Sequence, residues 1–105
     1  MSFTNQVVLI SGGSRGIGQA IAQSFAAQNA SVCINYHSNK TAALETLQSL
    51  SGTHHLVIQA DISKPDEVKK LVDQTVDHFG KIDILINNAG VYLPHPIDGV
   101  NYEDW

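Results

Sequence analysis

Glycines mark the first stretch of the chain whose residue types could do chemistry. Residues 11–18 read Ser-Gly-Gly-Ser-Arg-Gly-Ile-Gly and lie between a short apolar run and a segment of helical period. Backbone N–H groups in such a turn, together with the positive end of a helix dipole, can hold a diphosphate. We expect Gly12 to allow the tight turn, Gly16 to let phosphates approach the backbone and Gly18 to let the helix pack closely on the sheet. The alternative is a strand-to-helix connection that binds no ligand.

Two other glycine signatures do not fit this turn. A Walker A loop ends in Gly-Lys-Ser or Gly-Lys-Thr, whereas this turn ends in Gly18, Gln19 and Ala20. The Gly-x-Gly-x-x-Gly form requires a glycine or an alanine where this sequence has Ile21. The pattern that remains is Gly-x-x-x-Gly-x-Gly.

Two further polar motifs follow apolar runs later in the chain. Asp61 and Ile62 come after one such run, and residues 87–90, Asn-Asn-Ala-Gly, end another. With the glycine turn ahead of them in this order, the motifs resemble the short-chain dehydrogenase/reductase family over the whole chain. The sequence as a whole is similar to 3-oxoacyl-acyl carrier protein reductases and to glucose dehydrogenases. Taken alone, an aspartate after a strand is also a common capping or turn residue.

The resemblance implies a role for each of these residues. Asp61 and Ile62 would meet the adenine of a dinucleotide, and Asn87 would brace the sheet. The adenosine ribose and the nicotinamide side would be lined by Asn88, Ala89 and Gly90.

The residues beyond the second predicted strand, 31–36, bear on the choice between NAD and NADP. NAD sites usually place a carboxylate there to accept from the ribose 2′-hydroxyl, but this sequence has Tyr36, and its next carboxylate is Glu45. Donors that suit a 2′-phosphate are present instead, with Arg15 as the expected charge partner and Ser38 or Asn39 as neutral donors. We therefore predict NADP rather than NAD; the alternative is a solvated loop. The predicted cofactor-binding residues are Gly12, Ser14, Arg15, Gly16, Ile17, Gly18, Tyr36, His37, Ser38, Asp61, Ile62, Asn88, Ala89 and Gly90.

The resemblance implies hydride transfer between the nicotinamide and a carbonyl or alcohol, which needs a catalytic Tyr, Lys and Ser. We expect these groups beyond Trp105, and therefore predict no catalytic residue and no turnover in residues 1–105. Tyr36 and Lys40 do spell Tyr-x-x-x-Lys. They follow the second predicted strand, at the adenosine end, so we interpret them as non-catalytic. The alternative function is a non-catalytic dinucleotide-binding or interaction module.

The elements that must position these residues follow from the hydrophobic pattern. Short β-branched runs alternate with segments of helical period, which is typical of βαβ units and a parallel sheet covered on both faces. We predict an α/β fold with an incomplete, Rossmann-like, doubly wound parallel sheet of about four strands and three helices. Residues 1–105 would form the N-terminal part of one NAD(P)-binding domain. The predicted strands are 6–11, 31–36, 54–60 and 82–87, and the predicted helices are 16–29, 41–50 and a third that ends at Gly80.

Local signals refine two of these elements. Ile17, Ile21 and Phe25 recur on one face of the first predicted helix. Ser63 is the predicted N-cap of the third helix, with Pro65 in its first turn. In the strand order 3-2-1-4-5 the fourth strand is central, so within this chain we expect its outer edge to be bare and prone to self-association. Residues 102–105 resemble the opening of another helix.

Composition and charge narrow the possible partners. The 105 residues are 43% hydrophobic and carry a net charge of −4, which indicates a soluble domain without the basic stripe that nucleic acids or anionic membranes attract. The early apolar run from Val7 to Ile10 is too short to span a bilayer. The single cysteine, Cys33, favours a reducing compartment, which we take to be the cytoplasm. No Cys, His and carboxylate cluster has metal-site spacing, so we expect no metal. The partner should be a small molecule, and the resemblance implies a homo-oligomer.

Overall fold

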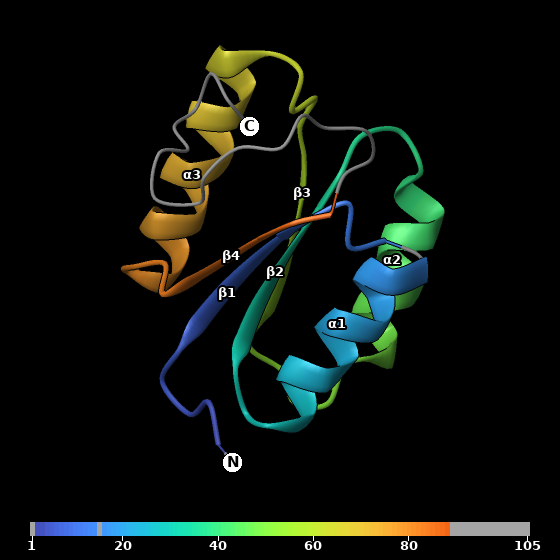
Figure 1. The fold of residues 1–105 in the computed structure, drawn as a ribbon, viewed down its shortest axis with the longest axis vertical. Coiled ribbons are helices and arrows are strands. Elements are labelled where there is room, and N and C mark those ends of the chain that lie inside the picture. The colour runs from blue at the N-terminus through green and yellow to red at the C-terminus, as the bar shows by residue number, and fades with distance from the viewer. Residues whose placement is uncertain (1, 15, 89–105) are drawn as a thin grey trace.

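The computed structural model describes residues 2–14 and 16–88, which form a parallel sheet with helices on both faces. Figure 1 shows α1 and α2 on one side of the sheet and α3 on the other. The α/β doubly wound architecture predicted from the sequence is thus confirmed. The strands are β1 (Val7–Ser11), β2 (Ser31–Tyr36), β3 (His55–Gln59) and β4 (Ile84–Asn87), and the helices are α1 (Gly16–Ala27), α2 (Lys40–Ser49) and α3 (Pro65–Phe79).

The strand order is β3-β2-β1-β4, and every neighbouring pair is parallel. The chain therefore moves outward from β1 to β3 and then crosses back to place β4 on the other side of β1. The carboxyl ends of all the strands lie at one edge, where Ser11 is in register with Asn35 on β2 and with Asn87 on β4. In open parallel sheets, ligands bind outside this edge, at the point where the strand order reverses.

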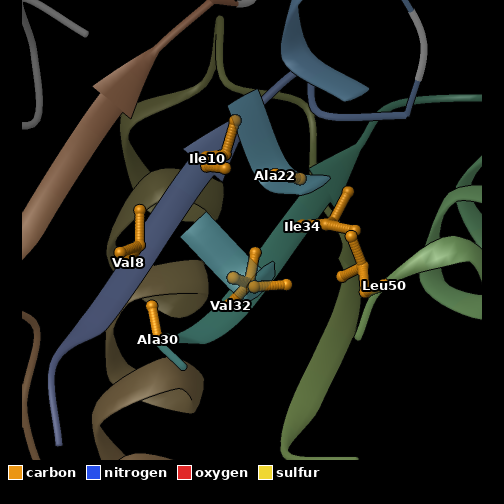
Figure 2. Close-up of a cluster of buried hydrophobic side chains, with 8 residues drawn as sticks. Val8, Ile10, Ala22, Ala30, Val32, Ile34 and Leu50 are labelled. Atoms are coloured by element: carbon orange, nitrogen blue, oxygen red, sulfur yellow. The ribbon is translucent and has the colours of Figure 1, made fainter. Parts of the chain in front are cut away.

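The core has two apolar layers because helices cover both faces of the central strands. Side chains on β1 and β2 alternate between the layers, so Val8 and Ile10 face α1 while Leu9 faces α3. Cys33 lies on the α3 side, and burial raises the pKa of its thiol to about 11, so it stays protonated. The layer under α1 and α2, shown in Figure 2, contains Val8, Ile10, Ala22, Ala26, Ala30, Val32, Ile34 and Leu50.

The buried face of α1 differs from the large-residue stripe seen in the sequence. Its buried positions are Gly18, Ala22 and Ala26, one residue further along than the predicted stripe. Ile17 is 72% exposed, whereas Ile21 and Phe25 flank the core and are only partly buried. Small side chains occupy the contact line because the helix lies close to the sheet.

The start of α3 corrects another prediction. Lys64, not Ser63, is the N-cap residue, and its side chain makes no capping bond. Ser63 turns back instead, donating from both its N–H and its hydroxyl to Oδ1 of Asp61. Pro65 opens the helix as predicted, and Gly80, in the left-handed region with φ of 89°, ends it.

Within the described part of the chain, β4 pairs with β1 alone, and it begins two residues later than predicted. Asp83, just before β4, joins this strand to the start of β1. The Val7 N–H donates to Oδ2 of Asp83 at 2.8 Å, and the Lys81 ammonium lies 3.0 Å from the same oxygen. The side chain of Leu85, on the same face of the sheet as that of Leu9, remains 46% exposed. No helix among residues 2–14 and 16–88 is long and apolar enough to cross a membrane.

Candidate functional site

A cleft of about 640 Å³ opens at the carboxyl edge of the sheet, where β1 leads into α1. It collects most of the predicted cofactor-binding residues, although they come from four separate stretches of sequence. Gly16, Ile17 and Gly18 lie next to the cleft at the head of α1 but do not line it, and Arg15, Ala89 and Gly90 fall outside the described residues. The cleft is lined by Gly12, Ser14, Asn35, Tyr36, His37, Ser38, Asn39, Ala60, Asp61, Ile62, Ser63 and Asn88.

The glycines of the turn are required by its backbone. Gly12 and Gly16 have φ values of 68° and 61°, a conformation that other residues adopt only with strain. A Cβ atom at Gly16 would have no atom within 4 Å, so the space beside this backbone is open. The first turn of α1 contains no acidic side chain that would compete for the positive end of the helix dipole. The turn therefore has the features of an anion cradle.

Gly18 lies where α1 comes close to the carboxyl edge of the sheet. A Cβ atom there would lie 2.3 Å from the Gly12 carbonyl oxygen and 2.8 Å from Cα of Gly13. A Cβ atom there would also lie 2.7 Å from the side-chain nitrogen of Asn88, so the close approach that needs glycine is between α1 and the residues that directly follow β1 and β4. Gly18 keeps the turn folded tightly against the head of the helix.

Neighbouring strands hold the turn in place. The Gly12 N–H donates to the Asn35 carbonyl at 3.1 Å, and the Asn88 side-chain amide donates to the Gly12 carbonyl at 3.4 Å. Below the turn, the Ser11 hydroxyl donates to Oδ1 of Asn87 at 2.9 Å. Asn87 therefore ties β4 to β1, while Asn88 both lines the cleft and contacts the turn.

The wall of the cleft opposite the turn is polar and fixed. Asp61 accepts from the Ser63 hydroxyl at 2.7 Å and from the Ser63 N–H at 3.0 Å, and these bonds hold the pKa of its carboxyl below the usual value. The His37 ring lies 3.7 Å from the other Asp61 oxygen. The Asp61 N–H donates to a carboxylate oxygen of Glu67 in the first turn of α3. Asp61 is thus an oriented anion at the mouth of the cleft.

The structure reveals a site residue that sequence reasoning missed. Asn35 is only 2% exposed, and its amide nitrogen lies within 3.3 Å of the carbonyl oxygens of Tyr36, Ile58 and Ala60. It therefore joins the carboxyl ends of β2 and β3 beneath the cleft. The available signal was one amide side chain in a strand that is otherwise mostly apolar.

Asn39 lines the cleft, but its side chain has a structural task. Its Oδ1 accepts from the Ala42 N–H at 3.0 Å, which makes Asn39 the N-cap of α2. Tyr36 is the last residue of β2 and Lys40 the first residue of α2. A strand end and a loop separate these two side chains, so they do not share one helical face.

Comparison with known proteins matches this chain to one family. The model for the short chain dehydrogenase family matches residues 6–105. The chain is 35% identical to glucose 1-dehydrogenase 2 of Bacillus subtilis. This match covers 97% of the chain and 41% of that relative. It is 38% identical to a 3-oxoacyl-[acyl-carrier-protein] reductase of Synechocystis, covering 99% of this chain and 43% of that protein.

Solved structures agree with the sequence matches. A short chain dehydrogenase from Burkholderia cenocepacia, in complex with NADP, superposes with a TM-score of 0.82 at 36% identity. The match covers 99% of this chain and 43% of that one. A blue fluorescent protein from a metagenomic library, in complex with NADPH, gives a TM-score of 0.81 at 36% identity over 99% of this chain and 44% of that one. The chain thus spans less than half the length of these relatives.

Proposed function

The chain belongs to the short chain dehydrogenase family, and we propose that it binds NADP for hydride transfer to or from a carbonyl or alcohol. Residues 1–105 would be the N-terminal part of the NAD(P)-binding domain. The observation that carries this proposal is the glycine turn at the carboxyl end of β1, with open space beside Gly16 and a cleft that extends from Gly12 to Asp61. A diphosphate at the turn leaves the rest of the cleft for the adenosine.

The residues of the cleft fit such a ligand. Backbone N–H groups of the turn and the head of α1 would hold the diphosphate, and Tyr36, His37 and Ser38 would surround the adenosine ribose. Asp61 and Ile62, on the far wall, would contact the adenine. Asn88 would meet the ribose from the β4 side. When bound, the nicotinamide supplies or accepts the hydride.

The end of β2 supports NADP over NAD. The position where a carboxylate would accept from a ribose 2′-hydroxyl holds Tyr36, followed by the donors His37 and Ser38. The carboxylate that does line the cleft, Asp61, is engaged by Ser63 and faces His37. Relatives with bound NADP and NADPH add further support. Arg15 completes the proposed charge complement for a 2′-phosphate.

We further propose that residues 1–105 bind the cofactor without turning over substrate. Proton transfer from a phenol near neutral pH needs a cation beside it to lower the phenol pKa. Tyr36 ends β2 and lines the cleft, whereas Lys40 begins α2, so the two side chains do not share a helical face. A purified chain of these residues should therefore show no NADPH oxidation with any carbonyl substrate, and turnover at a rate proportional to chain concentration would contradict this.

We also propose a small carbonyl or alcohol substrate, a homo-oligomeric assembly and a cytoplasmic location. The unpaired thiol of Cys33, buried and protonated, is compatible with a reducing compartment. The outer edge of β4, with Leu85 exposed, offers surface for a further strand or subunit.

Direct titration tests the cofactor proposal. Nicotinamide fluorescence should show NADPH binding at least about tenfold more tightly than NADH, since one charge-assisted hydrogen bond accounts for that ratio. Tyr36→Asp places a carboxylate at the end of β2 and should reverse the preference, while Tyr36→Phe should keep it. Equal affinities of the unmodified chain for both cofactors would overturn the preference for NADP.

A further inference from the structure

A buried hydroxyl on α2 reaches the glycine turn. Thr46 is fully buried, and its Oγ1 donates to the Ser14 carbonyl at 2.8 Å across 32 positions of sequence. Ser14 lines the cleft, whereas Thr46 does not. Burying a hydroxyl without a hydrogen bond lowers the stability of the fold, so Thr46 needs a partner. Its partner is the carbonyl of a residue in the glycine turn.

One further polar bond joins α2 to α1 through Ser49. The Thr46 carbonyl accepts from the Ser49 hydroxyl at 2.6 Å, and the Gln23 amide on α1 donates to the same hydroxyl oxygen at 3.0 Å. At its other end, α2 is capped by Asn39, which lines the cleft. The helix thus connects the adenosine end of the cleft to the turn and to the helix that follows the turn.

The hydrogen bond from Thr46 fixes the direction of the Ser14 carbonyl dipole, which would act on a bound anion. The Ser14 carbonyl oxygen carries partial negative charge, and Thr46 holds it on the α2 side of the turn. A carbonyl free to rotate into the cleft would repel a phosphate. The turn contains two residues in the left-handed region, Gly12 and Gly16, so its backbone has freedom that must be removed before binding. A turn ordered in advance loses less entropy when the ligand binds.

We propose that Thr46 is a positioning residue for the cofactor, which orders the glycine turn through Ser14 without touching the ligand. This inference rests on the proposed NADP-binding function. It also predicts that α2 responds to occupation of the turn, because the two are joined by a direct bond.

The test replaces the hydroxyl while keeping the shape of the side chain. Thr46→Val should raise the Kd for NADPH about tenfold, the effect expected from losing one ordering hydrogen bond. Thr46→Ser restores the hydroxyl and should recover most of the affinity. Serine keeps the hydroxyl but lacks the methyl group. Recovery of affinity in Thr46→Ser therefore shows that binding depends on the hydroxyl and not on packing of the methyl group.

Thr75 provides a matched control on α3. It is also fully buried, and its hydroxyl donates to the Leu71 carbonyl at 2.8 Å, away from the cleft. Thr75→Val should lower the melting temperature by an amount similar to Thr46→Val and leave the Kd for NADPH unchanged. Melting curves without ligand show that both variants are folded at the temperature of the titration.

A second measurement needs no substitution. NADPH should slow amide hydrogen exchange in residues 45–49 of α2 more than in α3, although the second half of α2 does not line the cleft. The inference is overturned if folded Thr46→Val binds NADPH as tightly as the unmodified chain, or if exchange in α2 slows no more than in α3. Failure of the unmodified chain to bind NADPH would instead refute the proposed function.

Discussion

Gly16 and Gly80 have the same backbone requirement in two different places. Both lie in the left-handed region, with φ of 61° and 89°, and a Cβ atom at either would meet nothing within 4 Å. Replacing either with alanine should cost roughly 1–2 kcal/mol of folding free energy through backbone strain alone. Only Gly16 lies at the proposed anion cradle.

Gly16→Ala should therefore weaken NADPH binding at least about tenfold, because an added methyl group occupies the space through which phosphates approach. Gly80→Ala is the matched control, with a comparable loss of stability and an unchanged Kd. Urea unfolding gives the stabilities and nicotinamide fluorescence gives the affinities. Equal binding by both variants would show that Gly16 is needed for the turn and not for a ligand.

Asp83 gives the fold a defined response to acid. The hydrogen bond from the Val7 N–H, and then Lys81, hold the pKa of the Asp83 carboxyl below its usual value. A lowered pKa in the folded state means that the stabilisation is present above the usual pKa and is lost as the pH falls through the lower, folded value.

Asp83→Asn should accordingly lower the urea midpoint at neutral pH, and the difference from the unmodified chain should shrink as the pH falls below about 4. Asp73→Asn, on the exposed side of α3 beside Lys69, is the control for removing one negative charge. A difference that stays constant between neutral and acidic pH would show that the Asp83 carboxylate is not the cause.

The hydrophobic pattern of α1 predicted the helix but not the face by which it contacts the sheet. The pattern predicted a helix, and the helix forms, but Ile17, Ile21 and Phe25 do not make the closest contacts with the sheet. Periodicity reports that a helix has an apolar side. It does not report which residues of that side allow the closest approach, since this depends on the shape of the opposing strands.

Ala22 lies in that contact and is fully buried, whereas Ala27, at the end of the same helix, is exposed. Ala22→Leu should destabilise the fold by about 1–3 kcal/mol, because the larger side chain would push α1 away from β1 and β2. Ala27→Leu should change the stability by less than about 0.5 kcal/mol. Thermal unfolding measures both. A tolerated leucine at Ala22 would mean that the contact between α1 and the sheet is loose.

The ends of the elements were harder to predict than their existence. The sequence favoured Ser63 as the N-cap of α3, since serine is a strong capping residue three positions before an acidic side chain. In the structure Asp61 takes both Ser63 donors, and Asp61 is in turn held by Glu67. A local capping signal was thus overridden by a polar network that belongs to the cleft.

Over the whole molecule, the alternation of apolar strands and helices was enough to predict a doubly wound sheet, because each strand between two helical layers must be apolar on both faces. The positions of the glycine turn and of Asp61 could also be predicted, because each motif directly follows an apolar run in the sequence. The contacts of Asn35 and Thr46 could not. Each joins segments more than 20 residues apart, and nothing in their local sequence indicates the partner.

We propose that the turn of residues 12–18 holds the diphosphate of a dinucleotide. The most direct test is a titration of the ¹⁵N-labelled chain with NADP⁺, followed by amide chemical shifts. We expect the amides of Ser14 and Gly16 to move most, and the amides of Gly52 and Thr53, in a separate pocket near the start of β2, to stay unchanged. Saturable binding that leaves residues 12–18 unshifted would contradict it.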